Sequence, residues 1–211
     1  KRMIKRIHII NKFILLIPIL SLLSGCLSLP SLVSEEKPEL YIITLPQGFS
    51  INIFAENVPG ARSMVLSPDG TLFVGTRGKG SVYAVLDHDR DNKADEVKII
   101  ASGLNMPNGV AFKGGSLFVA EIHRILRYDD IENNIDNPVP VVINDELPKD
   151  VHHGWRYLGL GPDNKLYLQI GAPCNICDPE YPYATIMRMN IDGTNLEAYS
   201  YGVRNSVGFD W

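Results

Sequence analysis

The feature that most constrains the fold is a strand–turn–strand unit that recurs along the chain. Four segments carry it: SMVLSPDGTLFVGTR (63–77), NGVAFKGGSLFVAEI (108–122), RYLGLGPDNKLYLQIG (156–171) and the start of a further copy, NSVGFDW (205–211). In each complete copy, two short apolar runs flank a turn rich in Gly, Pro, Asp or Asn, which is the pattern of a β-hairpin. These hairpins, together with the lack of a convincing amphipathic helix, predict an all-β fold.

The spacing of the copies predicts the kind of all-β fold. Equivalent apolar positions lie 46, 48 and 49 residues apart: Leu66, Phe112, Leu160 and Phe209. Each step also contains a second pair of apolar runs, such as SVYAVLD with EVKIIAS. Four short strands in roughly 40–50 residues is the period of a β-propeller, whereas an irregular β-sandwich predicts no equal steps. We expect residues 41–211 to form about three four-stranded blades and the start of a fourth, in a ring truncated at its C-terminal end.

The first 26 residues predict a lipoprotein signal peptide. Five basic residues open the chain: Lys1, Arg2, Lys5, Arg6 and Lys12. The apolar run 13–23 has the length of a signal-peptide core and is too short to cross a bilayer as a helix. LSGC then resembles a bacterial lipobox, in which Cys26 is acylated, with an ordinary secretory signal as the alternative. We expect a lipid-anchored, exported protein, in the periplasm or on the outer cell surface, with residues 27–40 as a tether.

Charge and cysteine content narrow the classes of partner. The sequence has 20 basic and 24 acidic residues; without the five basic residues of the signal, 15 basic face 24 acidic, a net charge of −9. This balance argues against a nucleic-acid partner. With Cys26 acylated, Cys174 and Cys177 remain as a pair in an oxidising compartment. A local disulfide is favoured over a redox pair or half of a zinc site, because no second Cys or His pair accompanies it.

The repeat register predicts where a site would form. Four residues before each aligned apolar position the residue is polar: Arg62, Asn108, Arg156 and Asn205. Equivalent positions on the innermost strands of a propeller surround the central channel, so we expect these four to line one channel mouth. His152, His153 and Arg204 directly precede such positions and are expected at the same mouth. Histidines and arginines that converge from different blades are candidates for a functional site.

Two stretches carry a resemblance to a known family: HHGWRYLGLGPDNKLYLQIG (152–171) and GVRNSVGF (202–209). They are similar to segments of the soluble PQQ-dependent sugar dehydrogenases, the glucose/sorbosone dehydrogenase family of six-bladed β-propellers. The resemblance runs from Leu45 to Trp211 and covers about the first half of a family member. It implies an oxidoreductase that oxidises an aldose or related polyol by hydride transfer to PQQ, with calcium as a second cofactor and a quinone or cytochrome as electron acceptor.

The resemblance also implies roles for individual residues. In a pattern like H-x-x-G-R, the family's histidine is the general base. The gap-free match, which we favour, gives His152, four residues before Arg156, whereas the three-residue spacing of some sorbosone-type members selects His153. Arg204 corresponds to the arginine that contacts the cofactor quinone, with Asn205 beside it.

The remaining cofactor-binding residues that we expect come from the ring and from the second repeat: Arg62, Asn105, Asn108 and Arg156. Asn105 stands where the glucose-oxidising members have a glutamine, and Val151 stands where they have an acidic residue. The resemblance therefore does not point to glucose in particular. Other residues that clamp the cofactor and its calcium would lie beyond Trp211, so this chain by itself is expected to be inactive.

A separate acidic loop is a candidate calcium site. DHDRDNKADE (87–96) places four aspartates at positions one, three, five and nine of a calcium-loop pattern: Asp87, Asp89, Asp91 and Asp95. Carboxylates spaced by two can converge on one hard cation. Asn92 replaces the usual glycine and Lys98 the usual glutamate, so the loop is not an EF-hand. The alternatives are a structural calcium site and a solvated acidic turn.

Two other functions remain open at this point. A calcium-dependent lactonase-like propeller would hold a metal at the mouth through Glu, Asn and Asp ligands, whereas this mouth offers His and Arg. A propeller that binds a sugar or a protein without catalysis would keep the fold and not the chemistry.

Overall fold

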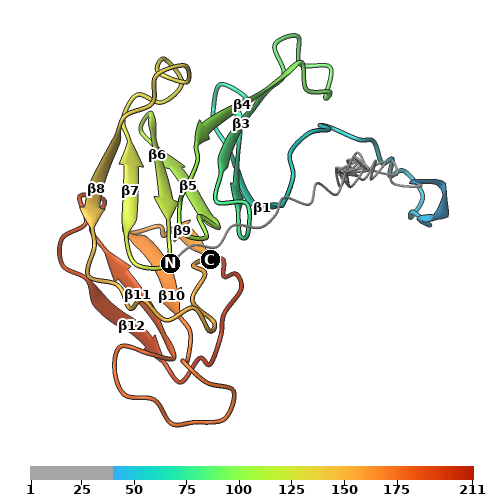
Figure 1. Cartoon of the computed structure of the whole chain (residues 1–211). Helices are drawn as coiled ribbons and strands as arrows, with labels where there is room; N and C mark the ends of the chain where they lie inside the picture. Colours follow the sequence, from blue (N-terminus) through green and yellow to red (C-terminus); the bar gives the residue numbers. More distant parts are fainter. Residues whose placement is uncertain (1–39) are drawn as a thin grey trace, which may run out of the picture. The chain divides into compact units, whose positions relative to one another are not determined.

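The computed structural model describes residues 40–211 (Figure 1). Cys26, the predicted signal peptide and nearly all of the predicted tether lie outside the described residues. The chain divides into two compact units, of which the first ends at Pro46 and the second is Gln47–Trp211. The described part of the first unit holds a short 3-10 helix, η1 (Leu40–Ile42). Among the described residues, no helix has the length and apolar character needed to cross a membrane.

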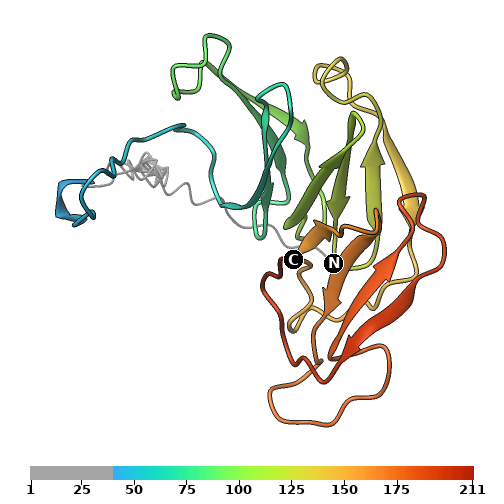
Figure 2. The ribbon, with the colours of Figure 1, turned by 180° about the vertical axis from the view of Figure 1, so that it is seen from behind.

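The second unit consists of three four-stranded antiparallel sheets in which consecutive strands pair (Figures 1 and 2). The first blade comprises β1 (Ala61–Leu66), β2 (Leu72–Thr76), β3 (Val82–Leu86) and β4 (Glu96–Ala101). The second comprises β5 (Gly109–Lys113), β6 (Ser116–Ala120), β7 (Ile125–Tyr128) and β8 (Pro140–Asn144). The third comprises β9 (Leu158–Leu160), β10 (Leu166–Ile170), β11 (Thr185–Met189) and β12 (Glu197–Tyr201). The predicted all-β propeller blades are confirmed, as sheets that do not close into a ring.

Packing between blades explains the apolar runs. The second strands β2, β6 and β10 are buried along almost their whole length, because the sheet faces of neighbouring blades pack on each other. Phe73 of β2 stacks on Phe112 of β5 with ring centroids 5.7 Å apart, which joins the first blade to the second. The outer strands β4, β8 and β12 are more exposed, and β4 and β12 also carry more polar residues.

The innermost strands β1, β5 and β9 contact one another in chain order. Two glycines permit a further close approach, at the ends of the second strands β2 and β10. A Cβ atom at Gly75 would overlap the Asn108 carbonyl oxygen, and one at Gly171 would overlap His153. Each glycine therefore lets the end of a second strand lie directly against a predicted site residue.

The predicted start of a fourth blade does not form a strand in the structure. Residues 205–211 form no strand. Instead, Phe209 meets the ring of Tyr157 edge-on at 5.0 Å, and Trp211 meets Tyr167 at 4.9 Å. Because a β-strand needs a neighbouring strand for its backbone hydrogen bonds, and the described residues offer this segment none, its aromatic side chains pack on the third blade.

Candidate functional site

The ends of the blades at which β1, β5 and β9 begin bring several predicted residues together. Arg62 Nε donates a hydrogen bond to Asn108 Oδ1 at 3.2 Å, and Asn108 Nδ2 donates to the Arg156 backbone oxygen at 2.6 Å. A polar chain thus crosses three blades at the positions that the repeat register selected. Asn108 is fully buried in this chain, so its side chain joins the blades.

The Arg156 side chain differs from the expectation of a cofactor contact. It is only 1% exposed, and its Nε and Nη2 donate to the carbonyl oxygens of Ile122 at 3.0 Å and Pro148 at 2.9 Å, while Nη1 lies 3.5 Å from that of Gln169. Burial lowers its pKa to about 10, so the guanidinium is still charged at neutral pH. The prediction that Arg156 faces a cofactor is therefore corrected: backbone carbonyls occupy its donors.

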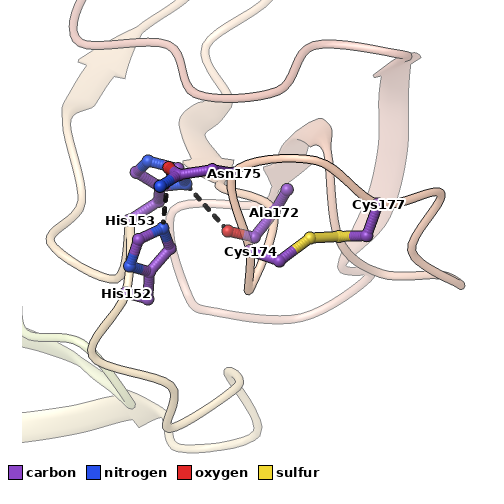
Figure 3. The surroundings of a disulfide bond; sticks show 6 residues. All are labelled: His152, His153, Ala172, Cys174, Asn175 and Cys177. Carbon is purple, nitrogen blue, oxygen red and sulfur yellow. Dashed lines mark hydrogen bonds between the residues drawn. A yellow bond between two sulfur atoms is a disulfide. The ribbon is translucent and has the colours of Figure 1, made fainter.

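His153 is oriented by a backbone carbonyl. It lies in the loop between β8 and β9 with a φ of 51°, in the left-handed region. Its Nδ1 lies 2.9 Å from the carbonyl oxygen of Ala172 (Figure 3). A carbonyl only accepts hydrogen bonds, so in the neutral ring the proton is on Nδ1 and the lone pair is on Nε2. The imidazole is therefore held in the tautomer that can accept a proton at Nε2.

His152 is more exposed and has a different partner. Its Nε2 lies 3.2 Å from Asn175 Oδ1, and its ring centroid is 4.1 Å from that of His153 (Figure 3). Asn175 belongs to a loop that the structure closes with a disulfide between Cys174 and Cys177, whose Cα atoms are 6.0 Å apart. The disulfide loop therefore brings Asn175 to the histidine pair. Sequence reasoning missed Asn175, because nothing local marks it.

Arg204 and Asn205 approach the same histidine from the segment after β12. The Ala172 amide donates to the Arg204 carbonyl oxygen at 2.8 Å, so Ala172 contacts His153 through its oxygen and Arg204 through its nitrogen. An added Cβ at Gly171 would meet both His153 and Asn205 Oδ1, which places the two residues close together on one side of Gly171. Asn205 Oδ1 is buried and has no hydrogen-bond partner among the described residues, whereas Arg204 is exposed.

Asn105 is not hydrogen-bonded to the histidines; its backbone is held by a different residue. Its backbone nitrogen donates to Glu121 Oε1 at 2.5 Å, and Glu121, which is 1% exposed, also pairs with Arg124. This buried carboxylate anchors the Asn105 segment to the end of β6. The Asn105 residue itself is exposed, and no hydrogen bond of its side chain links it to the other predicted site residues.

Trp155 is a further residue of this end of the blades. The centre of the Arg62 guanidinium lies 4.6 Å from its ring centroid, and that of Arg77 lies 5.7 Å away. Trp155 and Arg62 line an open cavity of about 400 Å³ together with Asn108 and Tyr157.

The acidic loop joins β3 to β4, and Figure 1 shows it at the opposite end of the blade from the start of β5. Carboxylate oxygens of Asp87, Asp89 and Asp95 lie within 4.8 Å of one another. Asp87 Oδ1 is buried without a hydrogen-bond partner among the described residues. Asp91 is not in this group; its Oδ1 accepts a hydrogen bond from the Lys93 amide at 2.8 Å. Three of the four predicted ligands are thus brought together.

Comparison with known proteins places the chain in a family. The sequence matches, over residues 35–210, the family described as domain of unknown function DUF7133. The chain belongs to this family. An uncharacterized protein of Borreliella burgdorferi is 28% identical to this DUF7133 chain over 181 residues, which cover 80% of the chain and 46% of the relative. The chain therefore spans about half the length of this curated relative.

Solved structures similar to the DUF7133 chain share its fold. The PQQ domain of pyranose dehydrogenase from Coprinopsis cinerea has a TM-score of 0.62 at 17% identity and covers 74% of the chain and 42% of that structure. A Trichoderma reesei enzyme of carbohydrate-active family AA12 has a TM-score of 0.59 at 18% identity and covers 74% of the chain and 44% of that structure. The PQQ-bound aldose sugar dehydrogenase of Streptomyces coelicolor has a TM-score of 0.52 at 20% identity and covers 68% of the chain and 48% of that structure. At these identities the likeness establishes the propeller fold alone.

Proposed function

We propose that the protein is an oxidoreductase that oxidises a CH–OH group of an aldose or related sugar or polyol, with PQQ as cofactor and His153 as general base. The observation that carries the proposal is the bond between His153 Nδ1 and the Ala172 carbonyl, at 2.9 Å. It fixes the ring and leaves Nε2 as the proton acceptor. Support for the redox chemistry comes from the HHGWR and GVRN motifs and from the shared fold.

The residues near His153 fit a ligand such as PQQ, which is flat, bears several carboxylates and has an N–H donor. Asn205 Oδ1 is a buried acceptor without a partner among the described residues, and a buried oxygen of this kind is usually satisfied by a ligand or water. Arg204 is exposed beside it and offers charged donors to an oxygen-rich ligand. We propose that these two residues hold the cofactor, which when bound would supply the quinone that accepts hydride.

The chain's own residues would then have distinct tasks. His153 Nε2 takes the proton from the substrate hydroxyl as hydride leaves the adjacent carbon. The Arg204 guanidinium offsets the negative charge that develops as the hydride is transferred, an effect that is larger where water is excluded. Asn108 and Arg156 hold the three blades together behind these groups and touch no reacting atom.

Dye-linked oxidation tests the proposal most directly. The protein expressed from its complete gene is incubated with calcium, with or without PQQ, and offered a panel of aldoses and polyols. We expect dye reduction only with PQQ. Absence of PQQ-dependent turnover, together with absence of PQQ binding in calorimetry, would contradict the proposal and leave a propeller that binds a sugar or protein without oxidising it.

We also propose that the β3–β4 loop binds one structural calcium ion through Asp87, Asp89 and Asp95. The paired substitution Asp87→Asn, Asp89→Asn is expected to remove one bound calcium per chain in equilibrium dialysis, because two of three clustered carboxylates lose their charge. Asp91→Asn is the matched control, since Asp91 belongs to the same loop but not to the cluster. Equal calcium content in the paired variant and the wild type would contradict this site.

We also propose, from the LSGC motif near the N-terminus, that the protein is exported and anchored to a membrane. Acylation at Cys26 would anchor the exported domain to a membrane surface, where a quinone or cytochrome could take up the electrons. Cys26→Ser is expected to move the protein from the membrane fraction to the soluble fraction of lysed cells. Unchanged retention in the membrane fraction would contradict the anchor.

A further inference from the structure

The cavity beside Trp155 is lined by one arginine of the first blade, Arg62, and a second arginine, Arg77, lies against the Trp155 ring without lining the cavity itself. Arg62 is the second residue of β1, and Arg77 directly follows the end of β2. Antiparallel pairing of the two strands therefore brings both arginines to one end of the blade. Each guanidinium centre lies within 6 Å of the Trp155 ring centroid, at 4.6 Å and 5.7 Å. Both arginines are exposed.

These two positive charges have no carboxylate partner in the described part of the chain. Arg62 uses its Nε for Asn108, which leaves its two Nη groups as donors. By contrast, Arg127 on β7 and Arg188 on β11 pair with the carboxylates of nearby acidic residues. Both guanidiniums contact the same ring, and an anion bound there would gain charged hydrogen bonds from them.

The size and lining of the cavity indicate a small ligand with an apolar face. Its volume of about 400 Å³ lies within the range of small-molecule sites. Trp155 and Tyr157 present aromatic surface, while Arg62 presents the free Nη groups of its guanidinium. An anionic group on a compact, partly apolar body matches this combination. A neutral sugar would leave both guanidiniums without a charged partner.

We propose that this cavity is a subsite for the carboxylate of a sugar acid, held by Arg62 and Arg77, with the sugar ring against Trp155. The inference rests on the proposed function and narrows its substrate from an aldose to a sugar acid such as a uronate. Trp155 lies two residues after His153, so the subsite and the proposed base are supplied by one loop. The carboxylate could also belong to the cofactor, and the experiment separates the two sources.

Ligand binding measured by isothermal titration calorimetry tests the inference without turnover. Glucuronate, glucose and PQQ are each titrated separately into the protein expressed from its complete gene. We expect glucuronate to bind at least about tenfold more tightly than glucose, because charged hydrogen bonds form only with the acid.

Substitution of the two arginines identifies the subsite. In the Arg62→Gln, Arg77→Gln variant, glucuronate affinity is expected to fall to the level of glucose, while Arg188→Gln, which removes an ion-paired surface arginine, leaves the preference intact. Equal affinity for the two sugars, or a preference that survives the double substitution, would overturn the inference. Loss of PQQ binding without any glucuronate binding would also overturn it, since the carboxylate would then be the cofactor's. Glucuronate binding without PQQ-dependent oxidation would support the subsite and reject the proposed function.

Discussion

Replacing His153 by asparagine is expected to lower kcat for sugar oxidation by at least about 100-fold, the usual contribution of a general base. Asparagine is the preferred replacement because it tolerates the left-handed backbone that His153 adopts, with φ at 51°. It retains no group that can take the substrate proton at the position of Nε2. The measurement is steady-state dye reduction by the PQQ-loaded protein expressed from its complete gene.

His152→Asn is the matched control, because the two rings are adjacent, with centroids 4.1 Å apart. It is expected to lower kcat less than tenfold, since His152 is more exposed and is bonded to the Asn175 side chain, not to the backbone. Calorimetry with PQQ shows whether either variant has lost the cofactor. A larger loss in the His152 variant would instead make His152 the base, as the gap-free spacing to Arg156 predicts.

Replacing Arg156 by leucine is expected to lower the free energy of unfolding by about 3–5 kcal/mol, the range for breaking a buried charged network. The guanidinium is 1% exposed and satisfies the carbonyl oxygens of Ile122 and Pro148. Leucine fills part of the volume but leaves these oxygens buried without donors. Urea unfolding followed by circular dichroism measures the change.

Arg127→Leu is the control for arginine removal as such, and its effect is expected to stay within about 1 kcal/mol, because Arg127 pairs with Asp129 at the surface. Arg156→Lys is expected to be intermediate, since an ammonium group cannot reach both carbonyls in the fork geometry of a guanidinium. An Arg156→Leu variant that is as stable as wild type but no longer binds PQQ would return Arg156 to the role of a cofactor contact.

The strands of all three blades could be predicted from the sequence because their signals are local. Alternating apolar residues and turn-forming Gly, Asp and Asn act over a few positions, and the 46- and 48-residue steps repeat them. The fourth copy, 205–211, has the same apolar pattern but forms no strand, because strand formation also requires a neighbouring backbone. Local pattern is therefore necessary for a blade strand and not sufficient.

The sequence by itself determined the blade period, the end of the blades where polar residues gather, and the loop in which aspartates cluster. Only the tertiary structure decided what each side chain does there. Arg156 turns inward to backbone carbonyls, and His153 takes its orientation from Ala172, 19 residues further along the chain. The physical reason is that hairpin formation depends on neighbouring residues, whereas the direction and partner of a loop side chain depend on which backbone groups the packed blades bring beside it.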